Sequence, residues 1–285
     1  MQANPARRPP VISIFLIVTF VWSWGIWGAM RAMPSLTPHS RAWGFIYVAA
    51  LSGPLVGAFV ASLLNGGFNG IQEWLRCLAV TRAHWTAYLL AVAVPPAIWI
   101  LSAFIERGQF SFGQSWMVLL IVWAKMLIRG GPLTEEVGWR GFLLPQLMRR
   151  MNLFWASVVI MGVWGIWHLP LWFVPGLPHT NWSFGLFMLF VAPLTLMFSW
   201  FYVKGSGSVW LPILFHTSIN FSLYFSWIEP GERSGPAFYF LDGIFWVFAV
   251  VLVLCNRQLW FSRPARKEVA SISSQQDLVA KPYGA

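Results

Sequence analysis

The chain has 285 residues, of which 58% are apolar and only 10% are charged, whereas about a quarter of the residues in an ordinary soluble domain carry charge. A water-soluble fold of this length has too little interior for so much apolar surface, so the composition excludes a soluble domain and indicates helices that face lipid. The net charge of +10 is spread over short loops and both tails without a basic stripe, which argues against a nucleic-acid partner.

The apolar runs are about twenty residues long, which is the length of a membrane-spanning helix rather than of a barrel strand. We therefore expect an all-α fold, a polytopic integral membrane helical bundle with about eight transmembrane helices. In chain order the expected spans are 11–32, 43–64, 86–105, 115–149, 154–173, 184–203, 208–224 and 237–255. We expect a single domain over 1–260, with a protease core at about 115–227, and a flexible cytoplasmic tail over 261–285.

The first span follows Arg7 and Arg8, as a signal peptide would, but its apolar stretch is longer than the about 7–15 residues of a signal core. It is therefore interpreted as an uncleaved helix. With eight spans, twelve Lys and Arg residues fall in the inner loops and tails and four in the outer loops. This asymmetry predicts that the N- and C-termini are both cytoplasmic. Between spans two and three, residues 70–85 are apolar at helical spacing and predict an interfacial amphipathic helix.

The fourth span is too long for one straight crossing. Its 35 residues would extend about 52 Å as a helix, against about 30 Å of hydrocarbon. The run Gly130-Gly131-Pro132 predicts a kink or break. A break at this depth is tolerated where it is buried in protein or lines a cavity.

Ionisable residues inside the spans are few, and each costs about 2.5–3.5 kcal/mol on insertion. The acids there are Glu135, Glu136 and Asp242, and the histidines are His168 and His216. We expect Asp242, near the end of the last span, to be a local hydrogen-bonding group. The other histidines, His39, His84 and His179, fall in loops and are expected to be solvated.

The spacing of these residues predicts specific contacts. Glu136 and Arg140 are four residues apart, which favours an intrahelical ion pair. Glu135 would then face elsewhere without a charged partner, as suits a general base. In the later spans, His216 and Asn220 share one helix face, and Trp164 lies one turn before His168 and could brace its ring.

The four polar groups lie at similar depths. At about 1.5 Å per residue, Glu135 and His168 are each roughly 22 Å from the inner end of their spans, and His216 is roughly 12–17 Å. We therefore expect Glu135, His168, His216 and Asn220 to share one cavity.

Such a cavity suits amide hydrolysis. Glu135 with His168 would take a proton from water, and His216 and Asn220 would donate to the oxyanion. Two histidines and one glutamate could instead hold a divalent metal such as zinc. Asparagine is a poor zinc ligand, which favours direct water activation, but the sequence leaves the metal open.

Three motifs resemble one family. Residues 135–140 fit EExxxR, residues 164–168 are similar to FxxxH with Trp164 in place of Phe, and residues 216–220 fit HxxxN. These motifs, in this order, resemble the CPBP (CAAX protease and bacteriocin-processing, Abi) intramembrane proteases, which include the type II CAAX prenyl endopeptidases. The resemblance implies an eight-helix fold and proteolysis within the membrane. It also implies that Glu135, His168, His216 and Asn220 are catalytic, with Glu136, Arg140 and Trp164 supporting them.

The predicted function is thus an intramembrane endopeptidase that hydrolyses a peptide bond in a membrane-bound protein or peptide, for which a prenylated CAAX-type C-terminus is one candidate. Its other partners are membrane lipids. Rival interpretations are a non-catalytic scaffold or bacteriocin-immunity protein of the same fold, or a proton-coupled transporter. Lys125 and Arg129, one turn apart before the break, have three possible roles: they could snorkel outward, line a way into the cavity or neutralise the glutamates.

Overall fold

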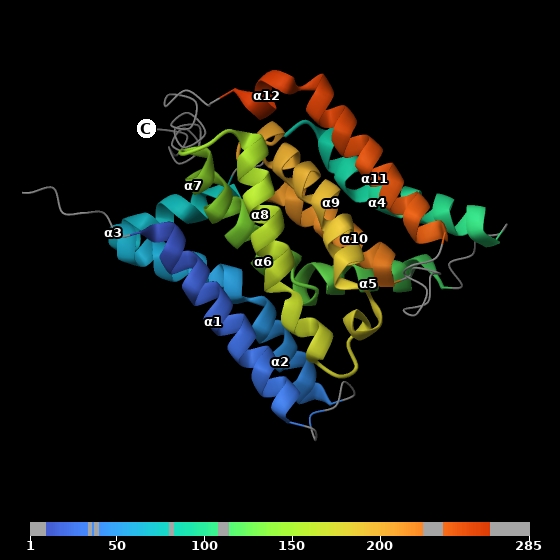
Figure 1. Ribbon diagram of the computed structural model, residues 1–285, viewed down its shortest axis with the longest axis horizontal. Coiled ribbons are helices and arrows are strands. Elements are labelled where there is room, and N and C mark those ends of the chain that lie inside the picture. The colour runs from blue at the N-terminus through green and yellow to red at the C-terminus, as the bar shows by residue number, and fades with distance from the viewer. Residues whose placement is uncertain are drawn as a thin grey trace, which may run out of the picture.

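The computed structural model describes residues 10–33, 36, 40–79, 83–107, 114–224 and 236–262. Within these ranges the chain forms helices and no strands, so the predicted all-α class is confirmed (Figure 1). The α-helices are α1 (Val11–Ala32), α2 (Arg41–Leu51), α3 (Gly53–Ala79), α4 (Trp85–Arg107), α5 (Trp116–Arg129), α6 (Pro132–Gly138), α7 (Leu144–Met148), α8 (Leu153–Trp167), α9 (Phe184–Lys204), α10 (Trp210–Tyr224), α11 (Pro236–Cys255) and α12 (Arg257–Phe261). The predicted tail lies outside the described residues from position 263 on.

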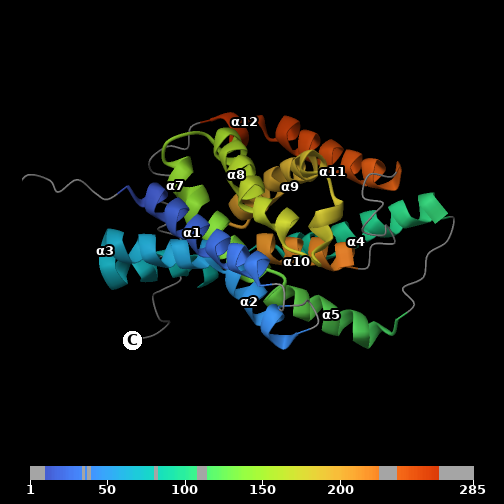
Figure 2. The same ribbon diagram turned by 60° about the horizontal axis from the view of Figure 1, so that its bottom comes forward.

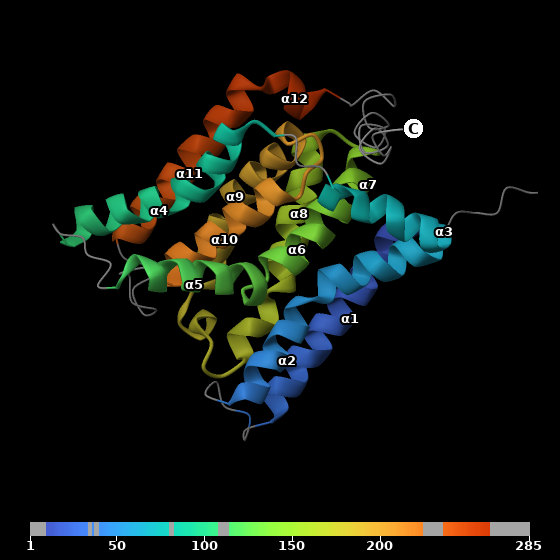
Figure 3. The ribbon, with the colours of Figure 1, turned by 180° about the vertical axis from the view of Figure 1, so that it is seen from behind.

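The short helix α6 lies at the centre of the bundle. It packs against α3 on one side and α10 on the other, and α8 packs against α9. Figure 1 shows α1, α2 and α3 on one flank and α4 with α11 on the opposite flank. Figure 2 shows α2 and α5 together at one edge of the molecule, and Figure 3 shows α5 crossing close to α10 and α6. The helices that carry the three motifs therefore meet in the interior.

The outer surface is apolar, as in a membrane protein. Ile17 and Val21 on α1 are 63% and 70% exposed, and Val247 on α11 is 64% exposed. By length and composition, five described helices can cross a membrane, and a sixth crossing arises if the bent pair formed by α5 with α6–α7 counts as one. The expected count of eight is not confirmed, because α2, α10 and the apolar part of α11 are short.

The second expected span is wrong in its bounds. α2 ends at Leu51 and α3 begins at Gly53, so the chain turns at Ser52 instead of continuing from 43 to 64. Pro54, which has no N–H to leave unsatisfied, stands at the second position of the new helix, where proline is favoured. A helical segment is present where one was expected at 70–85, but its bounds differ. It follows Gly66 and Gly67, whose backbone angles are not helical, and it ends at Ala79.

The predicted break in the fourth span is confirmed. α5 ends at Arg129, α6 begins at Pro132, and the two segments are bent by about 40°. Gly131 has φ +95°, a conformation that side chains rarely allow, and Pro132 opens the next helix. An unexpected π-helix, Trp139–Leu143, follows α6 directly. Such insertions are frequent at functional sites.

Glycine allows α3 to approach α6 closely. A Cβ placed on Gly138 would lie 2.5 Å from the Cβ and the carbonyl oxygen of Pro54. Because backbone cannot move aside as a flexible side chain can, any larger residue must push the two helices apart. This contact brings α3 directly against the segment that carries the first motif.

We predict that Gly138→Ala destabilises the bundle although alanine is the better helix former. Overpacking of this kind costs about 1–3 kcal/mol, so the thermal unfolding midpoint of the purified protein in detergent should fall. Gly162→Ala in α8 is the matched control, because a Cβ there meets nothing within 4 Å. Equal midpoints for the two variants would contradict the close approach of α3 and α6.

Candidate active site

Glu135 lies on α6 directly after the break and is 2% exposed. Its backbone N–H donates to the carbonyl of Gly131 at 2.8 Å, which fixes the first turn of the helix. Its Oε2 accepts a hydrogen bond of 2.8 Å from Nε1 of Trp164 on α8. Glu135 thus has no cation as partner among the described residues, but it is held by an indole donor that the spacing did not predict.

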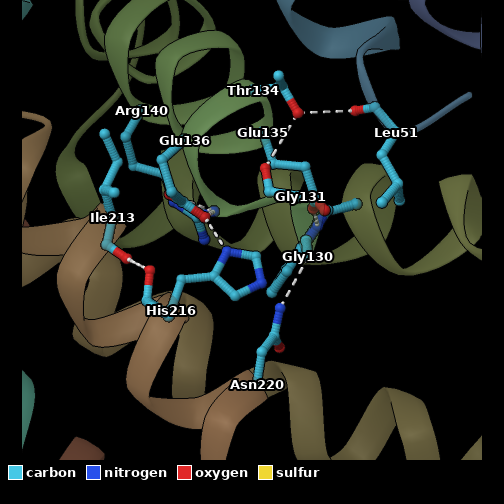
Figure 4. Close-up of polar contacts among 12 residues, drawn as sticks. Leu51, Gly130, Gly131, Thr134, Glu135, Glu136, Arg140, Ile213, His216 and Asn220 are labelled. Atoms are coloured by element: carbon cyan, nitrogen blue, oxygen red, sulfur yellow. Dashed lines mark hydrogen bonds and ion pairs between the residues drawn. The ribbon is translucent and has the colours of Figure 1, made fainter. Parts of the chain in front are cut away.

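Glu136 binds two partners. Arg140 Nη1 lies 3.0 Å from Oε1 and 2.9 Å from Oε2, which confirms the predicted ion pair. His216 Nδ1 on α10 is also 2.8 Å from Oε1, a contact between residues 80 positions apart (Figure 4). The carboxylate and the guanidinium are both fully buried. The guanidinium carbon of Arg140 lies over the rings of Phe198, at 4.3 Å, and Trp164, at 5.0 Å.

His168 is the C-terminal cap of α8. Its Nδ1 lies 2.8 Å from the carbonyl oxygen of Trp164, and because a carbonyl only accepts, this nitrogen carries the proton. Nε2 therefore has the lone pair of a neutral imidazole and can act as a base. Trp164 packs edge-on against the His168 ring with centroids 5.4 Å apart, so the predicted bracing is confirmed.

His216 and Asn220 each use one polar atom for anchoring. Asn220 Nδ2 donates to the Gly130 carbonyl at 3.0 Å, and His216 Nδ1 is bound to Glu136 (Figure 4). An amide nitrogen carries two protons, so Asn220 keeps a second N–H. Figure 4 shows the second ring nitrogen of His216 on the side of Gly130 and Asn220. Each group therefore retains a polar atom for another partner.

One cavity of about 670 Å³ brings the four predicted catalytic residues together. Glu135, His168, His216 and Asn220 all line it, as does the ring of Trp164. Glu136 and Arg140 lie behind this lining. Much of the remaining wall is aromatic or aliphatic and includes Trp43, Tyr47, Trp182, Phe187, Phe190 and Leu194. The site therefore combines a polar end with an apolar chamber.

A metal ion does not fit the donors as they are placed. In the part of the chain that the structure describes, no group of three His, Cys, Asp or Glu side chains lies close enough together to hold one. His168 and His216 direct their Nδ1 atoms to protein acceptors, and Glu135 accepts from Trp164. No step below is therefore assigned to a metal.

Two expectations for other residues change. His179 is not a solvated loop residue, because it is partly buried, lines the cavity and lies roughly parallel to His168 with ring centroids 6.5 Å apart. No sequence pattern marked it, since its place depends on the fold of residues 169–183. Asp242 is buried in α11 and does not line the cavity. Its Oδ1 has no hydrogen-bond partner among the described residues, so the expected local bond is not present at that atom.

Comparison with known proteins agrees with the motifs. Residues 116–222, which contain all three motifs, match the family described as "Type II CAAX prenyl endopeptidase Rce1-like". The chain is also 28% identical over 266 residues to CAAX prenyl protease 2 of Methanococcus maripaludis, an alignment that covers 88% of this chain and 96% of that protein. Both matches agree with the resemblance of the three motifs to this family of proteases.

We predict that Arg140→Leu strongly destabilises the protein, because it leaves the Glu136 carboxylate buried without its cation. Removing one partner of a buried pair costs about 3–5 kcal/mol, so the thermal midpoint in detergent should fall far more than in Arg149→Gln. Arg149 is the control because its ion pair with Glu73, at 4.0 Å, is exposed and contributes little. The double variant Glu136→Gln/Arg140→Leu should recover part of the loss. Purely additive losses would contradict the buried pair.

Proposed function

We propose that this chain, which is similar to the Rce1-like type II CAAX prenyl endopeptidases over residues 116–222, is an intramembrane endopeptidase that activates water with Glu135 and His168. The observation that carries the proposal is the shared cavity, in which a carboxylate, two imidazoles and one carboxamide from α6, α8 and α10 face the same space. The substrate class is a membrane-anchored protein or peptide. The apolar chamber can hold a prenyl chain or another lipid-soluble anchor.

The first step is attack by water on the scissile carbonyl carbon. Glu135 takes one proton from the water, and His168 Nε2 orients the water by accepting its other proton in a hydrogen bond. The new C–O bond forms as the carbonyl π bond opens, which places negative charge on the carbonyl oxygen. Glu135 contributes as a base because no cation in the described structure neutralises it.

The oxyanion is stabilised from α10. Asn220 donates its remaining Nδ2–H, and His216 donates from Nε2 when that nitrogen carries a proton. The Glu136 carboxylate, 2.8 Å from Nδ1, balances the positive charge of the His216 ring in that state. As the oxyanion collapses, the C–N bond breaks and Glu135 returns its proton to the leaving amine. The new carboxylic acid on the anchored part then loses its remaining proton to His168 Nε2 or to water and becomes a carboxylate, and the released peptide has a free amine.

The direct test is cleavage of a panel of farnesylated and unprenylated peptides by purified protein. We expect Glu135→Gln and His168→Ala to lower kcat by about 100- to 10,000-fold, as the loss of a general base does. Asn220→Ala should lower kcat by about 100- to 1,000-fold with little change in KM. The matched controls are Asp242→Asn, a buried acid away from the cavity, and His84→Ala, an exposed histidine.

Equal cleavage by wild type, Glu135→Gln and His168→Ala would show that the site is wrong. Cleavage that persists with a chelator is expected for direct water activation. Loss of cleavage with a chelator and its return with zinc would contradict the mechanism and favour a metal. Gradient-driven uptake into proteoliposomes without any cleavage would favour the transporter interpretation instead.

Trp164→Phe tests the indole donor separately, because phenylalanine keeps the aromatic ring and removes only Nε1–H. The carbonyl of residue 164 can still hold His168 Nδ1. We expect folding and KM to change little and kcat to fall by about tenfold, the usual scale for losing a hydrogen bond to a charged group. A kcat equal to that of wild type would show that the Trp164–Glu135 bond has no part in positioning the carboxylate.

A further inference from the structure

Two cations line the same cavity and have no part in the mechanism above. Lys125 and Arg129 are one turn apart on α5, and both face the space bounded by Glu135, His168, His216 and Asn220. Neither forms an ion pair with any residue that the structure describes. Neither cation pairs with a glutamate of the site: Arg140 pairs with Glu136, and Glu135 accepts a hydrogen bond from Trp164.

Hydrogen bonds on both sides of Lys125 and Arg129 in the sequence fix the orientation of α5. Trp123 Nε1 donates to Ser218 Oγ of α10 at 3.1 Å, and the N–H of Gly130 donates to the Met126 carbonyl at 2.9 Å. Asn220 then binds the carbonyl of Gly130. These bonds hold the helix face with Lys125 and Arg129 toward the cavity. Arg129 directly precedes Gly130, whose carbonyl accepts the hydrogen bond from Asn220.

The cavity has more fixed positive than negative charge. Apart from histidines, the lining contains one acidic side chain, Glu135, and two basic side chains, Lys125 and Arg129. Both cations are exposed and reachable by water, so an anion can meet them without a large desolvation cost. An anion that enters the cavity would therefore be bound at the α5 wall, away from Glu135.

The distance fits a short leaving peptide. Counted from Gly130 at about 1.5 Å per residue, Arg129 and Lys125 lie roughly 1.5 and 7.5 Å along the axis of α5, and their long side chains extend further. Each extended residue of a peptide adds about 3.3–3.6 Å. If the scissile bond lies at Asn220, the end of a short leaving peptide is within reach of these two side chains.

We propose that Lys125 and Arg129 are the residues that bind the free C-terminal carboxylate of the leaving peptide. The proposal rests on the proposed function and adds the residues that recognise the substrate's end. A guanidinium and an ammonium one turn apart suit a carboxylate, which offers two acceptor oxygens. The same cations could instead bind a lipid phosphate, and the experiment separates the two anions.

The test uses a farnesylated peptide made in two forms that differ only in a C-terminal carboxylate or carboxamide. We expect wild type to favour the acid by about tenfold in kcat/KM, the scale of one charge-assisted bond at a water-accessible site. In Lys125→Gln/Arg129→Gln the ratio of kcat/KM for acid over amide should approach one, because the acid loses its advantage. Lys204→Gln/Arg150→Gln is the matched control, because both residues are exposed and lie outside the cavity.

Binding separates failure of this proposal from failure of the proposed function. Glu135→Gln protein should bind the acid more tightly than the amide, and adding Lys125→Gln/Arg129→Gln should abolish the difference, whether or not any peptide is cut. Equal binding and cleavage of acid and amide by the parent proteins would overturn the carboxylate site and leave the protease intact. If the double variant keeps the acid preference but loses dependence on anionic lipid in vesicles, the cations bind lipid phosphate and the proposal is wrong.

Discussion

The fully buried carboxylate of Glu136 holds the site together. It binds Arg140 within its own helix and His216 on α10, so it joins the first and third motifs. Arg140 in turn lies against Trp164 of α8 and Phe198 of α9. Separating the partners of a buried ion pair strongly destabilises a protein, because each charge is then left buried and unpaired. Four helices must therefore keep their places for this one cluster to exist, and the cluster in turn fixes which nitrogen of His216 faces the cavity.

Where helices are interrupted near the site, side chains donate hydrogen bonds to the backbone carbonyls that the interruption leaves free. A free carbonyl in a membrane interior costs free energy unless it accepts a hydrogen bond. Asn220 binds the Gly130 carbonyl at the break before α6, and Thr134 binds the Leu51 carbonyl at the end of α2. Indole donors also bind carbonyls on neighbouring elements, namely Trp24 to Trp167, Trp74 to Val137 and Trp210 to Leu78. Part of the tryptophan content therefore satisfies backbone carbonyls, and two of these carbonyls, those of Val137 and Trp167, lie within two residues of Glu135 or His168.

The sequence predicted what depends on local spacing. Helix positions, the break at Gly130-Gly131-Pro132 and the Glu136–Arg140 pair all follow from periodicity, glycine and proline, and the i, i+4 rule. It did not predict the contacts of Glu136 with His216 or of Glu135 with Trp164, which join residues 80 and 29 positions apart. Those depend on how helices pack. The turn at Ser52 was missed although Gly53-Pro54 marks it, because the apolar run around it looks continuous.

A hydrolase inside a membrane has to bring water to a bond whose anchor prefers lipid. The cavity separates these requirements in space. Its apolar wall is built mainly from aromatic residues of α2 and α9, whereas its polar residues come from α5, α6, α10, the C-terminal end of α8 and the short segment Pro178–Asn181. In the proposed function, an amphiphilic substrate would lie with its anchor against the aromatic wall and its polar end toward the exposed cations of α5. The break between α5 and α6 brings these cations and Glu135 to the same cavity. Both halves of the bent segment therefore contribute to the polar end of the cavity.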